Sequence, residues 1–351
     1  MAVTVPTYVT RQQLAGALDV APSAAAAREL DRKIVEATAA VDQLCRRTFV
    51  PTTDTRSFDW PAPGHSSPSY RLWLDDDELI SLTSVTAGGV AVSTGDVLLE
   101  PVNEGPPYDR LDLNMGTSTF WTIDDTWQRS IVVTGLWGGS SDAREAVGTL
   151  SEALDTSETD IDVSAATAAA AGVGDVLVVD SERMLVTGWS WATTGETASL
   201  TASMADRSIT VADIGTYADG ETLLIGGERI LVVDRAGTTL TVDRAQGGTT
   251  LVAHTTATLF GARTLRVVRG SSGSTAASHS TGATIERQLY PALVSQLAFA
   301  EATVGWLQGR GGYSRSTQGA GESSRKAPTG TLEDLRDQCA RAHRRYRWAT
   351  V

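Results

Sequence analysis

An internal duplication between about residues 155 and 285 is the strongest constraint on this 351-residue chain. One motif occurs as DIDV then GDVLVVDSERMLV (160–163, 174–186), and again as SITV then GETLLIGGERILV (208–211, 220–232). A second motif occurs as LTVDRAQGGTTLVAH (240–254) and as LRVVRGSSGSTAASH (265–279). Along the chain, both copies of the first motif come before both copies of the second motif. We therefore expect one β module, 201–262, to be inserted into another made of 155–200 and 263–285. A tandem array with one degenerate half is the competing interpretation.

The two copies share charged residues at matching positions. These are Glu182, Arg183, Arg269 and His279 in one copy, and Glu228, Arg229, Arg244 and His254 in the other. Each Glu-Arg pair is interpreted as a cross-strand ion pair or a turn contact at a strand edge, which stabilises little if it is exposed. A further hypothesis pairs Arg244 and Arg269 with the glutamates. Because each histidine recurs once per module, we expect both to have structural roles.

The first 50 residues have a helical pattern. Thr10 and Gln13 form a capping-box motif, and Ser23 can cap a second helix. Apolar residues recur along that helix at spacings of three and four, which predicts one buried stripe made of Leu30, Ile34, Ala37, Val41 and Leu44.

Helical periodicity returns from Glu286. Its expected buried stripe consists of Leu289, Leu293, Leu297, Ala300, Val304 and Leu307. The polar, Gly/Ser-rich segment 309–330 is expected to be mobile, and Thr331 with Asp334 can cap a last helix.

Short β-branched and aromatic runs fill residues 52–139 and predict a small antiparallel β unit. The expected fold class is α+β, with a small helical bundle formed by the N- and C-terminal helices. The expected domains are a helical core (1–51 and 286–351), a β extension (52–150) and the duplicated β module (151–285). The end helices need each other because isolated helices of this length are marginal in water.

Charge is distributed unevenly along the chain. The net charge is −13, yet residues 309–351 carry nine Lys and Arg against four Asp and Glu. An acidic surface does not favour non-specific binding to nucleic acid. No apolar run is long enough to span a bilayer, and no signal peptide is evident at the N-terminus. Cys45 and Cys339 lack metal-ligand spacing and are expected to be buried thiols.

No motif predicts enzymatic chemistry. GxSxG, GxxxxGK[ST], HExxH and strand-linked GxGxxG motifs are all missing from the sequence. The acidic run Asp75–Glu78 and the pair Asp124–Asp125 lack the calcium-loop pattern, so the run is interpreted as a solvated turn. We expect no catalytic residue, metal or cofactor.

The basic C-terminal end is the clearest functional signal. Residues 341–348 combine cations with aromatic side chains, and the candidate interface residues are Arg341, Arg344, Arg345, Tyr346, Arg347 and Trp348. Such a set can anchor a protein interface, contact DNA or form a solvated helix end, and the first alternative is favoured.

The N-terminal segment YVTRQQLAGAL, followed by ELDRKIVEATAAVDQLCRRTF, resembles the N-terminal helices of head-to-tail connector (adaptor, or head-completion) proteins of tailed bacteriophages. The stretch from TRSFDWP to IVVTGLWG resembles the β extension of versions from phages of actinobacteria. LYPALVSQLAFAEATVGWLQ and the basic last helix resemble the C-terminal half of that family. The resemblance covers residues 8–150 and 285–350, and the duplicated modules lie outside it.

This resemblance implies a non-enzymatic structural subunit of the phage neck. It implies a homo-oligomeric ring, usually dodecameric, that docks under the portal protein and contacts a stopper or tail-terminator protein. Genomic DNA would pass through the channel without sequence-specific binding. Assembly is expected in the host cytoplasm, with no membrane partner. The alternatives are a tail or baseplate protein with carbohydrate-binding β modules that present Trp189 and Trp191 in a loop, a hydrolase, and a DNA-binding regulator.

Overall fold

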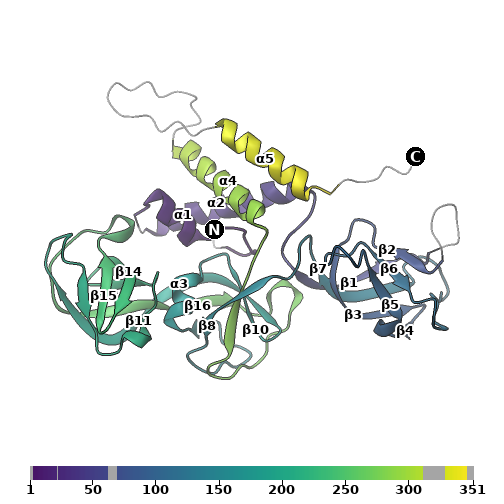
Figure 1. Ribbon diagram of the computed structural model, residues 1–351, viewed down its shortest axis with the longest axis horizontal. Helices are drawn as coiled ribbons and strands as arrows, with labels where there is room; N and C mark the ends of the chain where they lie inside the picture. Colours follow the sequence, from purple (N-terminus) through teal and green to yellow (C-terminus); the bar gives the residue numbers. More distant parts are fainter. Residues whose placement is uncertain (1–2, 22, 62–68, 311–328, 346–351) are drawn as a thin grey trace. The chain divides into compact units, whose positions relative to one another are not determined.

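The computed structural model describes residues 3–21, 23–61, 69–310 and 329–345. Helices and antiparallel sheets are combined in one chain (Figure 1). The chain divides into two compact units. The first unit comprises 1–41, 144–271 and 275–341, and the second comprises 42–143, 272–274 and 342–351.

The second unit is built from two antiparallel sheets around one core. A four-stranded sheet has the order β1-β7-β3-β4, and a three-stranded sheet has the order β2-β6-β5. The strands are β1 Thr52–Phe58, β2 Arg71–Trp73, β3 Leu79–Ala87, β4 Val90–Val92, β5 Val97–Glu100, β6 Arg110–Leu113 and β7 Ile131–Trp137, with a 3-10 turn η1 at Thr94–Asp96. Trp121 and Trp137 are buried in the core that the sheets share.

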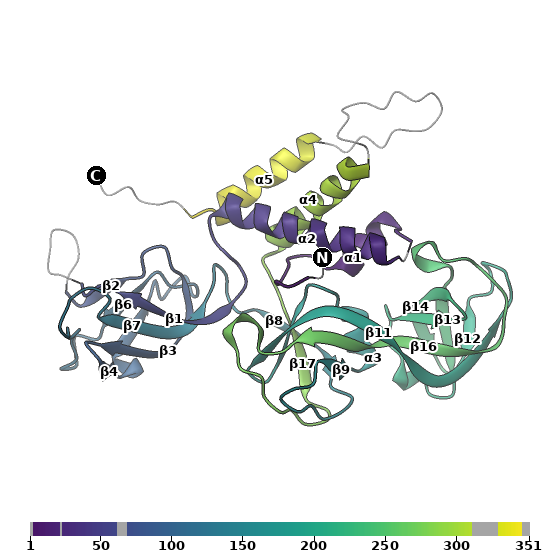
Figure 2. The same ribbon diagram turned by 180° about the vertical axis from the view of Figure 1, so that it is seen from behind.

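The first unit contains the helices and a large antiparallel sheet, seen from behind in Figure 2. Its helices are α1 Arg11–Leu18, α2 Ala24–Cys45, α3 Ala165–Ala170, α4 Ala292–Arg310 and α5 Thr329–His343. Its strands are β8 Arg144–Thr149, β9 Asp160–Asp162, β10 Val176–Val179, β11 Glu182–Leu200, β12 Ser208–Thr210, β13 Thr222–Ile225, β14 Glu228–Ala236, β15 Thr239–Asp243, β16 His254–Val268 and β17 Thr284–Gln288. Its 3-10 turns are η2 Ile214–Thr216 and η3 Gln246–Gly248, while η4 Ser271–Gly273 begins in this unit and ends in the second.

Strand pairing in this sheet repeats a single pattern. The outer module is formed by β9, β10, the first half of β11, the second half of β16, and β17. Its strand order is β10-β11-β16-β9, and β17 pairs with β10. The inner module is formed by β12–β15 and the first half of β16. Its order is β13-β14-β15-β12, and β16 pairs with β13. The chain completes the inner module before it returns to the outer one.

The registers of the two modules also correspond. Val176 pairs with Leu185 in the outer module, and Thr222 pairs with Leu231 in the inner one. In both modules a glycine lies two residues before a strand, and its backbone amide donates across the hairpin. Gly174, before β10, donates to the Val186 carbonyl at 2.9 Å, and Gly220, before β13, donates to the Val232 carbonyl at 2.8 Å. The matched sequences therefore adopt matched backbone hydrogen bonds.

The N-terminal helices begin where their caps predict. The Thr10 side chain accepts from the Gln13 amide, and the Gln13 side chain accepts from the Thr10 amide, which completes the capping box. Ser23 Oγ accepts from the Ala26 amide at 3.0 Å. Leu30, Ile34, Ala37 and Val41 are buried in α2 as expected, whereas Leu44 is only half-buried and Cys45 is buried in its place.

The predicted face of the C-terminal helix α4 is largely wrong. Its buried residues are Val294, Leu297, Ala298, Ala302 and Trp306, while Leu307 is exposed. Glu286 belongs to strand β17 rather than to a helix. The reason is that α4 carries apolar residues on nearly every side, so its periodicity does not select one face.

Helices from opposite ends of the chain are in contact within the first unit. A Cβ atom built on Gly305 of α4 would lie 3.3 Å from Cδ of Lys33 in α2, so the two helices approach closely there. The rings of Tyr8 and Tyr290 pack edge-to-face with centroids 4.8 Å apart. Arg336 of α5 donates to Glu301 of α4 at 2.8 Å. Figures 1 and 2 both show α4 and α5 side by side.

The N-terminal segment is also fixed to the duplicated β region. The Thr7 amide donates to the Gly174 carbonyl and the Arg11 amide donates to the Val173 carbonyl, each at 3.0 Å. Gln12 Oε1 accepts from the Val173 amide at 2.8 Å. The loop before β10 is therefore held by the segment that leads into α1.

Candidate functional site

Each β module contains a buried carboxylate with a set of converging donors. In the outer module, Arg269 donates from Nε and Nη2 to the two oxygens of Glu182 at 2.7 and 2.9 Å. The amides of Gly270 and Ala277 also donate to Glu182, each at 3.0 Å, and His279 Nε2 lies 2.8 Å from Oε2. The Glu182 side chain is fully buried.

The inner module repeats this network. Arg244 donates from Nε and Nη2 to Glu228 at 2.7 and 2.8 Å, as the repeat alignment predicts. The Ala245 amide donates at 3.0 Å, and His254 Nε2 lies 2.9 Å from Oε2. Both side chains of the Arg244–Glu228 pair are fully buried.

Each arginine also donates hydrogen bonds to backbone carbonyls of the loops around its glutamate. Arg269 donates to the carbonyl oxygens of Asp155 and Glu158 at 2.9 and 2.8 Å. Arg244 donates to the carbonyls of Thr201 and Asp206 at 3.0 and 3.2 Å. The networks therefore bind backbone carbonyl groups of the surrounding loops, which is a structural role.

Electrostatics in the networks favour the ionised carboxylate. Burial alone would raise the pKa of Glu182, but hydrogen bonds from Arg269, the Ala277 amide and His279 lower it to about 2. The same balance of burial against hydrogen bonds from Arg244, His254 and the Ala245 amide sets the pKa of Glu228 at about 2. A carboxylate held in this way is a poor general acid or base near neutral pH.

One histidine contact differs between the modules. His279 Nδ1 lies 2.8 Å from Asp180 Oδ2, so both of its ring nitrogens face carboxylates. The inner module has Gly226 near the corresponding ring nitrogen, where a Cβ atom would lie 2.9 Å from His254 Nδ1. Because an ionised carboxylate only accepts, both contacts of His279 are hydrogen bonds when both ring nitrogens carry a proton.

The expectation that each glutamate forms an ion pair with an arginine is confirmed, but the alternative of a contact at a strand edge is wrong. Glu182 and Glu228 are buried, and their partners are Arg269 and Arg244 rather than the adjacent arginines. Successive side chains of a strand point to opposite faces, so a neighbour in sequence cannot reach the same network. Arg183 is buried, whereas Arg229 is half-buried.

Arg229 lies against two tryptophan rings. Its guanidinium carbon lies 5.4 Å from the centroid of Trp189 and 5.8 Å from that of Trp191. The two rings pack edge-to-face at 4.7 Å. The expected placement of these tryptophans in a loop is wrong, because both belong to strand β11 and are half-buried. Burial lowers the pKa of Arg229.

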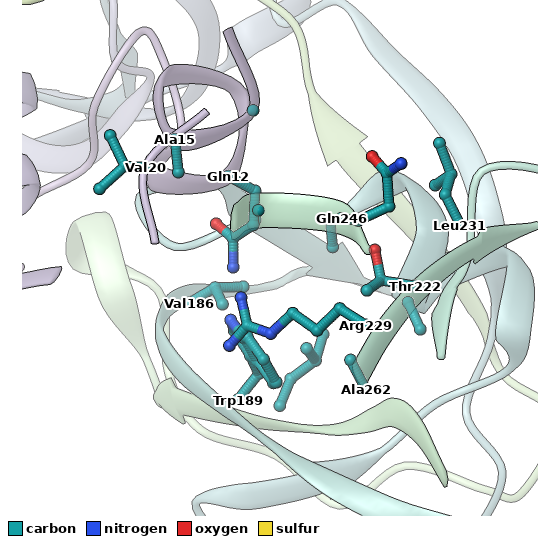
Figure 3. A pocket seen from close by; sticks show the side chains of 16 residues that line it. Gln12, Ala15, Val20, Val186, Trp189, Thr222, Arg229, Leu231, Gln246 and Ala262 are labelled. Carbon is teal, nitrogen blue, oxygen red and sulfur yellow. The ribbon is translucent and has the colours of Figure 1, made fainter. Parts of the chain in front are cut away.

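Two adjacent cavities open beside this cluster, one of about 290 Å³ and one of about 360 Å³. Gln12, Ala15, Val20, Trp189 and Arg229 line both of them. Figure 3 shows Arg229 extended over Trp189 with its guanidinium facing Gln12. The remaining wall of the smaller cavity is mainly apolar and includes Val186, Leu231 and Leu265. Sequence reasoning missed this site because its residues come from segments more than 150 positions apart.

The basic C-terminal end is described only in part. Arg341 is exposed, and Arg344 is half-buried. Arg345 donates from Nη2 to the Asp75 carbonyl at 2.7 Å and from Nη1 to the Asp76 carbonyl, so it contacts the acidic turn of its own unit. Tyr346, Arg347 and Trp348 lie outside the described residues, as does most of segment 309–330.

Other candidate chemistry is limited. Within the ranges that the structure describes, no cluster of three His, Cys, Asp or Glu side chains could hold a metal ion. Cys45 and Cys339 are both buried, as expected. No helix in the described part of the chain has the length and hydropathy needed to cross a bilayer.

Comparisons of this chain with protein-family models, with curated proteins and with solved structures gave no match.

Proposed function

We propose that the chain is a structural subunit of the neck of a tailed-phage particle, a head-to-tail adaptor that works in a ring. The observation that carries this proposal is the packing of helices from both ends of the chain. Lys33 of α2 lies against Gly305 of α4, and Arg336 of α5 forms an ion pair with Glu301 of α4. A helical bundle made in this way is a platform from which β regions can extend.

The character of the buried charged groups supports a structural role. The Glu182 and Glu228 networks use their donors and acceptors internally, so they leave little capacity for acid–base work. In each module, the matching network links the loops around the glutamate by hydrogen bonds, which makes these loops rigid without a metal or disulfide. Rigid, repeated β modules suit a subunit that is held in contact with neighbouring copies.

The partners follow from the same proposal. The ring, expected to hold twelve copies, docks beneath the portal protein through the exposed cations near the end of α5, with Arg341 as the clearest candidate. A stopper or tail terminator binds the opposite side. A net charge of −13 allows DNA to pass without being held, since phosphate binding depends on concentrated positive charge.

Electron microscopy tests the proposal directly. The purified chain is examined for rings with a central channel, and particles of the phage that encodes it are labelled with an antibody raised against the chain. Label at the single vertex where head meets tail is the expected result. Label at the tail tip would instead favour the carbohydrate-binding alternative, and particles without any label would rule out a virion role.

A further inference from the structure

The unusual group in the first unit is Arg229. Its guanidinium is half-buried over Trp189 and Trp191, and within the described residues it makes no ion pair with a carboxylate. Other arginines of the same sheet, such as Arg244, Arg263 and Arg269, each bind a glutamate. Burying a cation without a counter-ion costs free energy, and a ligand that supplies negative charge would offset this cost.

A second donor faces the same space. The Gln12 oxygen accepts from the Val173 amide, which leaves the amide nitrogen of Gln12 directed into the cavity. Gln12 and Arg229 line both cavities, and Figure 3 shows their nitrogens turned toward each other. Two donors that face one another need an acceptor between them, and a carboxylate matches the bidentate geometry of a guanidinium.

Most of the remaining lining is apolar, and Thr222 and Gln246 add two polar side chains to the smaller cavity. Ala15 and Val20 face both cavities, and Val186, Leu231, Ala262 and Leu265 complete the wall of the smaller one. A volume of about 290 Å³ lies at the lower end of the range for small-molecule sites. An occupant therefore needs a small apolar body in addition to its charge.

We propose that this cavity binds a small organic carboxylate, with its carboxylate held by Arg229 and Gln12 and its apolar body against the Val186–Leu265 wall. The tryptophan rings hold the guanidinium in position by cation–π contact, so the cation is oriented before the ligand arrives. This site is independent of the ring-forming role and remains testable if that role is wrong.

Calorimetric titration at neutral pH with hexanoate tests the proposal, with hexanamide as the uncharged match and hexyl phosphate as the alternative anion. The wild type is expected to bind hexanoate saturably, with a Kd of about 1 mM or tighter. Hexanamide, which lacks the charge, is expected to bind at least about tenfold more weakly, and hexyl phosphate no more tightly than hexanoate. Absence of saturable hexanoate binding, equal binding of hexanamide, or tighter binding of hexyl phosphate overturns the proposal.

Three variants locate the site. Arg229→Gln is expected to weaken hexanoate binding at least about tenfold, whereas Arg28→Gln, which removes an exposed cation from α2, leaves it unchanged. Gln12→Glu keeps the acceptor for the Val173 amide and places a carboxylate beside Arg229. It is therefore expected to abolish hexanoate binding and to raise the melting temperature. If Arg229→Gln does not fold, Gln12→Glu decides, and hexanoate binding by Gln12→Glu equal to that of the wild type contradicts the assignment.

Discussion

Arg244 and Glu228 form a bidentate ion pair at 2.7 and 2.8 Å in which both side chains are excluded from solvent. Such a pair stabilises little compared with an apolar replacement, but removing one partner leaves a buried charge uncompensated. The inner module therefore needs both partners of this pair in order to be stable. The equivalent pair in the outer module is Arg269 with Glu182.

Removing the arginine is expected to be costly. Arg244→Ala should lower the free energy of unfolding by about 3–5 kcal/mol, because Glu228 loses its main donor. Arg266→Ala is the control, since Arg266 binds Asp160 at 2.8 Å on the exposed surface and should contribute little to stability. Urea unfolding followed by circular dichroism measures both. An Arg244→Ala variant as stable as the control would show that the network is not needed.

Acid is expected to destabilise the modules between pH 4.5 and 2. The pKa of Glu228 is about 2 in the folded chain and 4.5 when unperturbed, so its contribution is complete above pH 4.5 and is lost as the pH falls toward 2. Glu182 behaves in the same way. Each network should contribute on the order of 2 kcal/mol across this range. Urea unfolding at pH 5, 4 and 3 should therefore show the gap between the wild type and Glu228→Gln closing with acid. A constant gap would contradict the lowered pKa.

Asp175 should have the opposite effect. Burial raises its pKa from 3.8 to about 6, despite the nearby Arg287 and a hydrogen bond from the Gly172 amide at 2.9 Å. The folded chain therefore binds an extra proton between pH 4 and 6, and this group lowers stability as the pH rises through that range. Asp175→Asn keeps an oxygen for the Gly172 amide without the charge. It should be more stable than the wild type by about 3 kcal/mol at pH 7 and equal to it below pH 4. Thermal melts of both proteins at pH 4, 5, 6 and 7 measure this difference. If the two melting temperatures change in parallel with pH, the pKa of Asp175 is not raised.

Charge reversal near the end of α5 tests the proposed interface with the portal protein. Arg341 is exposed, so Arg341→Glu should leave the fold intact but place a negative charge at the proposed docking surface. Because a like-charge contact costs several kcal/mol, assembly of tails onto heads should fall at least about tenfold. Arg28→Glu makes the same change at an exposed position of α2 and should have no effect. Complementation of a phage that lacks this gene, scored by plaque titre and microscopy, compares them. Equal titres for the two variants would remove Arg341 from the interface.

Local signals in the sequence predict the starts of the N-terminal helices, whereas the predicted cap at Thr331 is wrong because α5 begins at Thr329. The Thr10 capping box and the Ser23 cap form as expected, because each depends on residues three positions apart. The Arg244–Glu228 pair could also be predicted, because the duplication shows which charged residues recur together. The face of α4 could not, since an apolar helix buries whichever side its neighbours cover.

Long-range structure was harder to predict. The segment around Trp189 contains Gly, Ser and Thr and has the composition of a loop, yet it forms part of β11 because β16, more than 60 residues later, pairs with it. The cavity beside Arg229 depends on Gln12, which lies 217 positions away and is brought there by contacts of the N-terminal segment with the loop before β10. No local sequence pattern predicts either arrangement, because a segment forms a strand according to the strands it packs beside more than according to the intrinsic β-propensity of its residues.

Strand β16 passes without a break from the inner module into the outer one, and β11 accompanies it in the opposite direction. For the outer module, residues near 190 must meet residues near 264, which is an entropically costly closure in an unfolded chain. Once residues 200–254 have folded, the same two ends emerge side by side as a hairpin, and the distant partners become near neighbours. We therefore expect the nesting to favour folding of the inner module before the outer one, and synthesis on the ribosome also completes the inner module first.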